Sequence, residues 1–314
     1  MNFADRLMEK IDQKQSHVCV GLDPRLNQIP ENIKDKAIKN YGKTTEAVAK
    51  SFLEFNKGII DAVAEHTAIV KPQMAFYEQY GYWGVKAFED TVAYAKDSGL
   101  LVISDAKRND IGSTAKAYAD GHLGRPDFWE GETLVNKADS LTVTPYLGSD
   151  GIIPFVDSCQ EHDKGIFTLV KTSNPSSGEL QDLVTKADSR IYEEIAKLVV
   201  CWGEELIGER GYSSIGAVVG ATYPSEARTL REIMVNNYFL VPGYGAQGGS
   251  ADDVIDCFND DGYGAVVNSS RGIIFAYQQK RYSNDYKEAA KQAVIEMKEA
   301  INNSLAKEDK LAWQ

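Results

Sequence analysis

Eight short apolar runs alternate along this chain with stretches of helical periodicity, and several of the runs end in a polar or Gly/Pro cluster. Apolar runs of this length are typical of strands buried on both faces, as in parallel sheets. Strand and helix alternating eight times predicts a (β/α)8 TIM barrel, with a doubly wound open sheet as the alternative. The runs cover residues 18–22, 68–70, 101–104, 140–143, 165–170, 215–219, 238–241 and 265–267.

The intervening segments carry apolar residues at helical spacing. At the start of the chain, Phe3, Leu7 and Ile11 share one helical face. Thr44 or Thr45 is a candidate N-cap for the next long helix. Further helices are predicted over residues 85–95, 191–206, 251–258 and 286–305.

Residues 1–314 are expected to form one domain, because no internal repeat, low-complexity tract or linker divides them. Ser283 or Asn284 is the N-cap candidate for the last helix, and the polar residues 306–314 are expected to fray. Three connections exceed typical loop lengths and indicate functional loops or extra short helices. They cover residues 23–43, 121–137 and 172–189.

Composition excludes several classes of protein. A formal net charge of -12 with no basic face argues against general nucleic-acid binding. No apolar run approaches the length that spans a membrane, and the acidic N-terminal segment is unlike a secretory signal, so we expect a cytoplasmic protein. The four cysteines and four histidines show no metal-ligand spacing, and we expect reduced, mostly buried thiols and no metal site.

The third apolar run ends abruptly in the charged residues Asp105, Lys107 and Asp110. In parallel α/β folds the carboxyl ends of the strands carry the chemistry, because the loops there vary without disturbing the core. A solvated surface ion pair is the ordinary alternative. The first and second runs end near Asp23 and Lys71, so a barrel would gather two lysines and up to three carboxylates at one end. Such an array keeps a lysine charged and ready for proton transfer.

Three further strand ends carry ligand-binding features. A polar loop, residues 171–178, follows the fifth run and could hydrogen-bond a planar heterocycle. A glycine-rich turn, residues 242–250, follows the seventh run, and Arg271 follows the eighth. The loops after strands seven and eight form the usual phosphate site of this barrel class, and a guanidinium suits a phosphate geometrically. The pairing of the turn with Arg271 favours a phosphate site over plain turns.

Taken together, these blocks resemble the orotidine 5'-monophosphate decarboxylase family, specifically its longer bacterial subgroup, over nearly the whole chain. The likeness follows family order. It rests on residues 21–25 (GLDPR), 70–73 (VKPQ), 105–114 (DAKRNDIGST), 144–148 (TPYLG), 172–175 (TSNP), 219–222 (VGAT), 242–249 (PGYGAQGG) and 270–272 (SRG).

The resemblance implies a cofactor-free carboxy-lyase that makes uridine 5'-monophosphate (UMP) for pyrimidine synthesis. Lys107 would protonate C6 of the pyrimidine, flanked by Asp105 and by Asp110 of a partner subunit in a homodimer. Lys71 would bridge Asp105 and the ribose. The partner would also supply Ile111 and Thr114.

The resemblance also implies the residues that hold the substrate, orotidine 5'-monophosphate (OMP). Asp23 would bind a ribose hydroxyl, Ser173 would contact the pyrimidine, and Gln247 and Arg271 would hold the phosphate. Thr144 and Asn174 stay unassigned. The remaining implied binding residues are Pro242 and Gly248.

Two other functions stay open at this point. Related barrels place a similar acid and lysine group around Mg²⁺, which makes a metal-dependent sugar-phosphate aldolase or synthase the nearest alternative. A non-catalytic nucleotide-binding regulator is the other, since the charged cluster could serve only to recognise a ligand.

Overall fold

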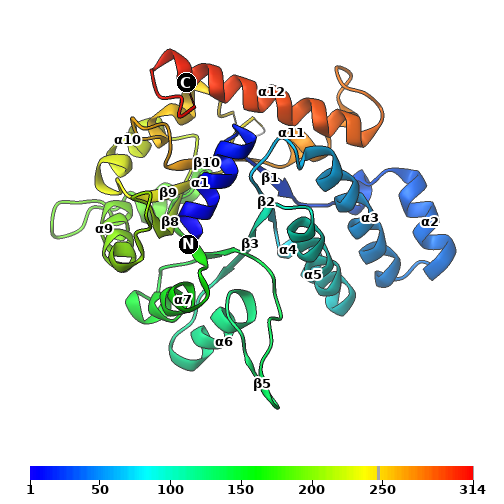
Figure 1. The fold of residues 1–314 in the computed structure, drawn as a ribbon, viewed down its shortest axis with the longest axis horizontal. Coiled ribbons are helices and arrows are strands. Elements are labelled where there is room, and N and C mark those ends of the chain that lie inside the picture. The colour runs from blue at the N-terminus through cyan, green and yellow to red at the C-terminus, as the bar shows by residue number, and fades with distance from the viewer. Residues whose placement is uncertain (246–247, 314) are drawn as a thin grey trace.

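In a computed structural model, which describes residues 1–245 and 248–313, eight parallel strands close into a barrel (Figure 1). Their order around the barrel is β1-β10-β9-β8-β7-β6-β3-β2, so β1 closes the sheet by pairing with β10. The TIM barrel is confirmed, and the open sheet is wrong. The strands are β1 (Val18–Leu22), β2 (Ile69–Pro72), β3 (Leu101–Arg108), β6 (Ser140–Val143), β7 (Gly165–Lys171), β8 (Ser213–Val219), β9 (Asn237–Val241) and β10 (Ala265–Ser269).

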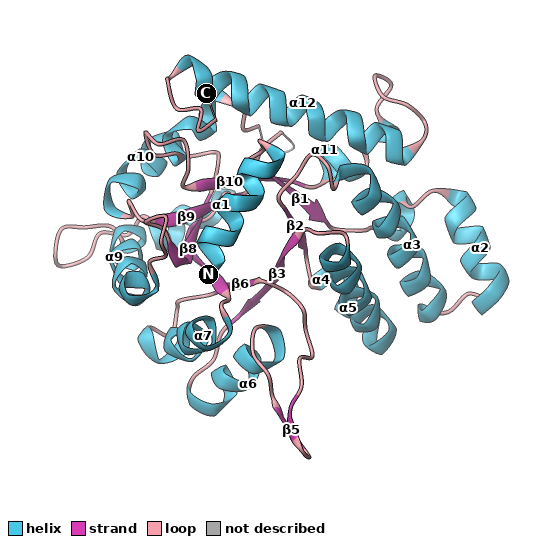
Figure 2. Cartoon of the chain, viewed as in Figure 1, coloured by secondary structure: helices cyan, strands magenta, loops and turns pink. Residues whose placement is uncertain are grey.

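Helices surround the barrel (Figure 2). Thr44 caps α3 as predicted, because its side chain accepts from the amide of Ala47. The α-helices are α1 (Phe3–Lys14), α2 (Glu31–Tyr41), α3 (Thr45–Val63), α4 (Ala75–Glu78), α5 (Gly81–Asp97), α6 (Gly112–His122), α7 (Ser149–His162), α8 (Gly178–Gln181), α9 (Ile191–Gly203), α10 (Pro224–Ile233), α11 (Arg271–Ile274) and α12 (Tyr286–Lys307).

Short elements occupy the three long connections. The first holds a 3-10 turn and α2, the second holds a hairpin, and the third holds a 3-10 turn and α8. The hairpin strands are β4 (Asp127–Phe128) and β5 (Gly131–Glu132). The 3-10 turns are η1 (Leu26–Gln28), η2 (Pro175–Ser177), η3 (Glu204–Leu206), η4 (Asp252–Cys257) and η5 (Ala276–Gln278).

Two helix predictions need correction. The helix predicted over residues 251–258 is the 3-10 turn η4, in which Val254 and Cys257 are the buried residues. Their spacing of three matches the 3-10 period, so a tighter turn buries both. The N-cap of α12 is Asp285, not Ser283 or Asn284, and its carboxylate accepts from the amides of residues 287 and 288.

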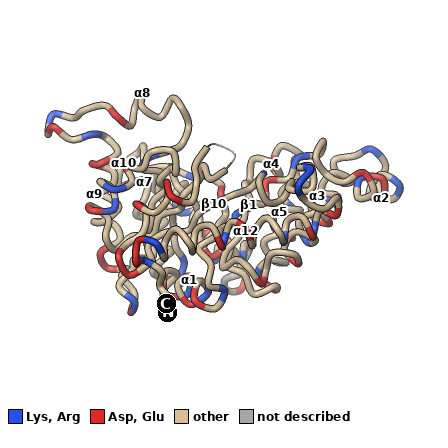
Figure 3. The backbone as a smooth tube through the Cα atoms, turned by 90° about the horizontal axis from the view of Figure 1, so that it is seen from above, with Lys and Arg blue, Asp and Glu red and all other residues tan. Residues whose placement is uncertain are grey.

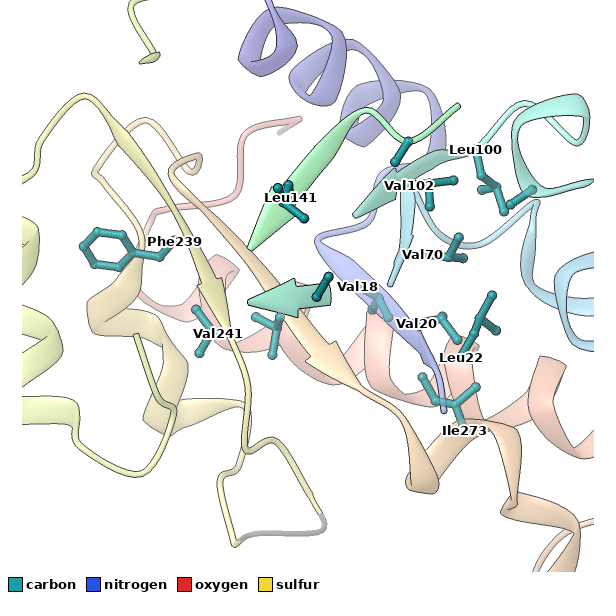
Figure 4. Packing of buried hydrophobic residues seen from close by; sticks show 14 of the residues in the cluster. Val18, Val20, Leu22, Val70, Leu100, Val102, Leu141, Phe239, Val241 and Ile273 are labelled. Atoms are coloured by element: carbon teal, nitrogen blue, oxygen red, sulfur yellow. The ribbon is translucent and has the colours of Figure 1, made fainter. Parts of the chain in front are cut away.

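The core has two parts. Apolar side chains of the strands pack outward against the helices, and Val18, Val20 and Val241 belong to this layer (Figure 4). A second cluster fills the barrel at its amino end, where α1 covers the opening and Phe3 meets Phe167 edge-on at 6.0 Å. Burial of this kind contributes about 25 cal/mol for each Å² of apolar surface.

The two ends of the barrel differ in what they carry. In Figure 3 the segments labelled α4 and α8 rise at one edge of the molecule, while α1 and both termini lie at the opposite edge. Near the chain's end, the Trp313 ring stacks on buried His17 with centroids 5.1 Å apart. In the described part of the chain, no helix combines the length and apolar character needed to cross a membrane.

Candidate active site

Asp105 lies at the centre of the charged array at the carboxyl end of the barrel. Its Oδ2 is 2.6 Å from the Nζ of Lys71, and its Oδ1 is 2.6 Å from the Nζ of Lys107. Lys71 and Asp105 are both buried, whereas the side chain of Lys107 is 45% exposed. One carboxylate therefore holds two ammonium groups, and the side chain of Lys107 is far more exposed than that of Lys71.

Thr142 of β6 fixes this array, and the sequence analysis missed it. Its hydroxyl donates to Asp105 Oδ1 at 2.8 Å and accepts from the backbone amide of Lys107 at 3.0 Å. Lys107 has a φ of 49°, a left-handed conformation that is uncommon outside glycine. The pairing of β3 with β6 also shifts register between Ser104 and Arg108. A bulge of this kind re-aims side chains next to active sites, and here it lies in the segment that carries Asp105 and Lys107.

Each charged group in this array stabilises the ionised form of its partner. Burial alone would raise the pKa of the Asp105 carboxyl, but the ammonium groups of Lys71 and Lys107 hold that pKa well below its usual range. Burial alone would lower the pKa of Lys71, but the carboxylates of Asp105 and Asp23 raise it above its usual value. Lys71 and Asp105 are therefore both charged at neutral pH.

Asp23 lies just after β1 and is not among the lining residues of either cavity described below. Its Oδ1 is buried and has no hydrogen-bond partner among the described residues. Burial raises the pKa of this carboxyl, and the Lys71 ammonium partly offsets the rise. Buried polar atoms are almost always paired, so this oxygen suits a hydroxyl group brought by a ligand.

A cavity of about 420 Å³ opens beside Lys107. Leu169, Val218 and Leu240 give it an apolar side, and the array and the β7 loop give it polar groups. Pockets for small ligands have this size and this mixture of surfaces. The remaining lining residues are Lys71, Asp105, Thr142, Thr172, Ser173, Asn174, Gln181 and Pro242.

Ser173 reaches the cavity because the backbone of the β7 loop lies directly against Gly220. A Cβ at position 220 would lie 2.9 Å from the Cβ of Ser173 and 3.0 Å from its backbone. Only glycine fits there without moving the loop. The loop after the fifth barrel strand therefore lines the cavity through Thr172, Ser173 and Asn174, and its contact with a planar ligand stays a prediction.

Arg271, one of the predicted phosphate residues, lines a second cavity of about 540 Å³ together with Gly272 and with Tyr244 and Gly245 of the glycine-rich turn, and Gly248 is not part of this lining. The glycine-rich turn is held by two backbone hydrogen bonds. The Gly245 amide donates to the Gly249 carbonyl at 2.8 Å, and the Gly248 amide donates to the Gly245 carbonyl at 2.9 Å. Positive φ values at residues 243, 245 and 248 make glycine necessary. Gln247 lies outside the described residues.

Asp110, Ile111 and Thr114 are not part of this cavity's lining as described. The Asp110 carboxylate accepts from the amide of Ile111 at 2.8 Å, and among the described residues it forms no ion pair with Lys107. Ile111 and Thr114 are exposed at the start of α6. Within one chain, no hydrogen bond or ion pair between described residues joins Asp110 to the array.

Within residues 1–245 and 248–313, no three His, Cys, Asp or Glu side chains are grouped so that they could hold a metal ion. Three of the four cysteines are buried, and Cys201 is exposed.

The chain is similar over nearly its whole length to known proteins. Residues 16–286 match the family described as orotidine 5'-phosphate decarboxylase / HUMPS. An orotidine 5'-phosphate decarboxylase of Rhodopirellula baltica is 45% identical over 306 residues, covering 96% of this chain and 99% of that protein. One from Caldicellulosiruptor bescii is 41% identical over 306 residues, covering 98% and 100%. The OMP decarboxylase structure from Leishmania donovani aligns with a TM-score of 0.72 at 32% identity, covering 97% of this chain and 99% of that one. The chain therefore belongs to the orotidine 5'-phosphate decarboxylase family.

Proposed function

We propose that this barrel converts OMP to UMP and CO2 without a cofactor, and that Lys107 donates the proton to C6. Decarboxylation is the activity of the family to which the chain belongs. The single observation that supports the assignment of residues is the array in which Asp105 holds Lys71 and Lys107 at 2.6 Å each, beside a cavity of ligand size.

The reaction explains why such an array is useful. The bond between C6 and the carboxylate breaks, CO2 leaves, and the electron pair stays on C6 in an orbital that the ring carbonyls cannot delocalise. A proton from the Lys107 ammonium then forms the C6–H bond of UMP. Because the ring cannot spread the charge, fixed charges around C6 must stabilise it.

Asp105 and Lys107 act in opposite senses on the reacting group. A substrate carboxylate placed beside the Asp105 charge is repelled in the ground state, and the Lys107 ammonium attracts the charge that grows on C6. Asp105 also keeps Lys107 positioned through their 2.6 Å contact. Because Thr142 binds both residues, the array is organised before substrate arrives.

Contacts remote from C6 supply further stabilisation. Difficult reactions need barrier reductions of up to about 23 kcal/mol, more than two side chains provide. In this proposal Ser173 and Pro242 contact the pyrimidine, and Asp23 and Lys71 bind the ribose. The phosphate of OMP is bound by Gln247, Gly248 and Arg271. Binding energy from the distant phosphate fixes the ring against the array.

A homodimer would complete each site with Asp110, Ile111 and Thr114 of the second subunit. Ile111 is 54% exposed, and a group of other apolar side chains from the same part of the chain is exposed with it. Exposed apolar surface of this kind marks interaction sites. The group comprises Tyr118, Phe128, Trp129, Tyr146, Leu147 and Ile153.

Mixing two inactive proteins tests the shared site. Lys107→Ala and Asp110→Ala subunits, mixed in equal amounts and allowed to exchange, give heterodimers with one doubly damaged site and one intact site. About half of the dimers are mixed, so roughly a quarter of wild-type activity returns. If Asp110 acts within its own chain, every site carries one lesion and verified exchange restores nothing.

The reaction itself is tested by following the ultraviolet absorbance change of OMP with and without a metal chelator. Decarboxylation at an unchanged rate in chelator is the expected result. Loss of activity that Mg²⁺ restores would favour the metal-dependent aldolase or synthase class. Tight binding of OMP without release of CO2 would favour a nucleotide-binding regulator.

A further inference from the structure

Lys171, the last residue of β7, is a fully buried lysine that the reaction does not use. Its Nζ lies 2.5 Å from Oδ1 of Asp182, which directly follows α8 and is 34% exposed. The ammonium also lies over the rings of Tyr223 and Tyr192, with distances to the centroids of 4.6 Å and 5.4 Å. The lysine therefore contacts the β7 loop, the first turn of α9 and the start of α10 together.

A buried ammonium is costly for a fold, and an apolar side chain of similar size often serves stability as well or better. Stability alone gives little reason for Lys171. Its contacts suggest a different role, because Asp182 closes a segment, residues 172–182, that begins immediately after Lys171 itself. The ion pair therefore joins the two ends of this segment.

Hydrogen bonds inside the segment maintain its shape. Oε1 of Gln181 accepts from the amide of Thr172 at 3.0 Å, and Nε2 of Gln181 donates to the Thr172 hydroxyl at 2.8 Å. That hydroxyl donates in turn to Oδ1 of Asn174 at 2.6 Å. The Ser177 hydroxyl lies 3.3 Å from the hydroxyl of Tyr223, the residue whose ring faces Lys171.

Ser173 lies between Thr172 and Asn174, so its position depends on this closed segment. It lines the cavity beside Lys107, and its backbone rests against Gly220. A loop fastened at one end only could swing away from the cavity and take Ser173 with it. The ion pair at the base opposes this, together with the hydrogen bonds between Gln181 and Thr172.

We propose that Lys171 is a positioning residue for catalysis, which through Asp182 holds the β7 loop closed so that Ser173 meets the pyrimidine ring. This inference rests on the proposed role of Ser173. Lys171 touches neither the substrate nor the charged array in this account.

The first test replaces Lys171 with methionine, which keeps its length and removes the charge. Because a misplacement of about 1 Å can cost on the order of 100-fold, kcat/KM for OMP should fall about 10- to 100-fold. The loss should be equal for the phosphate-free nucleoside, since the ring is common to both. Arg6→Met is the matched control, because it breaks the 2.7 Å ion pair of Arg6 with Asp139 near the amino end of the barrel. It should leave kcat/KM within about twofold of wild type.

A double-mutant cycle with Ser173→Ala separates positioning from mere stability. If Lys171 acts through Ser173, adding Lys171→Met to Ser173→Ala causes little further loss of kcat/KM, because coupled residues are not additive. Full additivity, or a Lys171→Met protein as active as wild type, overturns the proposal. If Ser173→Ala alone has no effect, the assignment of Ser173 in the proposed function fails instead.

Asp182→Asn provides the same test from the exposed side of the ion pair. If Lys171→Met does not fold, Asp182→Asn takes its place in the cycle with Ser173→Ala. A loss of kcat/KM that disappears in the Ser173→Ala background supports the proposal. Wild-type kcat/KM in a folded Asp182→Asn protein contradicts it.

Discussion

Replacing Thr142 with valine would remove one hydroxyl while keeping the shape of the side chain. That hydroxyl donates to the Asp105 carboxylate at 2.8 Å and accepts from the Lys107 amide at 3.0 Å. The variant therefore loses a hydrogen bond to a charged group and leaves the amide of the strained Lys107 without its acceptor. We expect both the stability of the fold and the rate of decarboxylation to fall.

The size of the effect follows from these two bonds. A hydrogen bond to a charged group contributes about 1.5–3 kcal/mol, and losing the acceptor of a backbone amide costs about 1–3 kcal/mol. If the loss of the charged bond is felt fully in the transition state, kcat/KM falls about 10- to 160-fold, since about 1.4 kcal/mol corresponds to tenfold. If the two costs add, unfolding in urea should show a loss of stability of about 2.5–6 kcal/mol.

Steady-state decarboxylation of OMP measures the change in rate, and Thr142→Ser is the control. Serine restores a hydroxyl at the same position, so it should recover most of the activity. If folded Thr142→Val keeps wild-type kcat/KM, or if serine is as poor as valine, then the hydroxyl does not organise Asp105 and Lys107.

Three further predictions concern other parts of the molecule. Arg271→Ala should lower kcat/KM strongly for OMP and hardly for the phosphate-free nucleoside, because only OMP offers a dianion to the guanidinium; equal losses would assign Arg271 another role. Gly220→Ala places a Cβ 2.9 Å from that of Ser173, so it should lower kcat/KM for both substrates, and unchanged kinetics would show that the loop yields. Burial lowers the pKa of His17 to about 3 from 6.5, so its contribution to stability is complete above about pH 6.5 and falls by about 1.4 kcal/mol per unit as the pH drops toward 3. In urea unfolding, the free energy of unfolding of His17→Phe should fall less than that of the wild type between about pH 6 and 4. If the free energy of unfolding changes with pH as steeply in the variant as in the wild type, this reasoning is refuted.

Much of the fold could be predicted from the sequence because its strands are continuous apolar runs. All eight predicted runs overlap the strands of the barrel. The structure also places Lys71 and Lys107 against Asp105, as expected from residues at the ends of β2 and β3. Both results depend on one physical rule: parallel strands bring their carboxyl ends to the same edge.

The features that were missed depend on contacts between strands. Thr142 looks like any β-branched residue of a buried strand, and only the pairing of β3 with β6 shows that it faces Asp105. The left-handed φ of Lys107 has no signal in its residue type. Lys171 did carry a signal, because it ends an apolar run just as Lys71 does. Its partner Asp182 lies in a loop whose path the sequence does not determine.

The proton donor is the central assignment, and decarboxylation by Lys107→Ala tests it most directly. Lys107 supplies both the positive charge near C6 and the proton, so the variant should lose kcat by several orders of magnitude while it stays folded and still binds UMP. Ultraviolet assays at saturating OMP measure the rate, and circular dichroism checks the fold. A folded Lys107→Ala protein with near wild-type kcat would contradict the account.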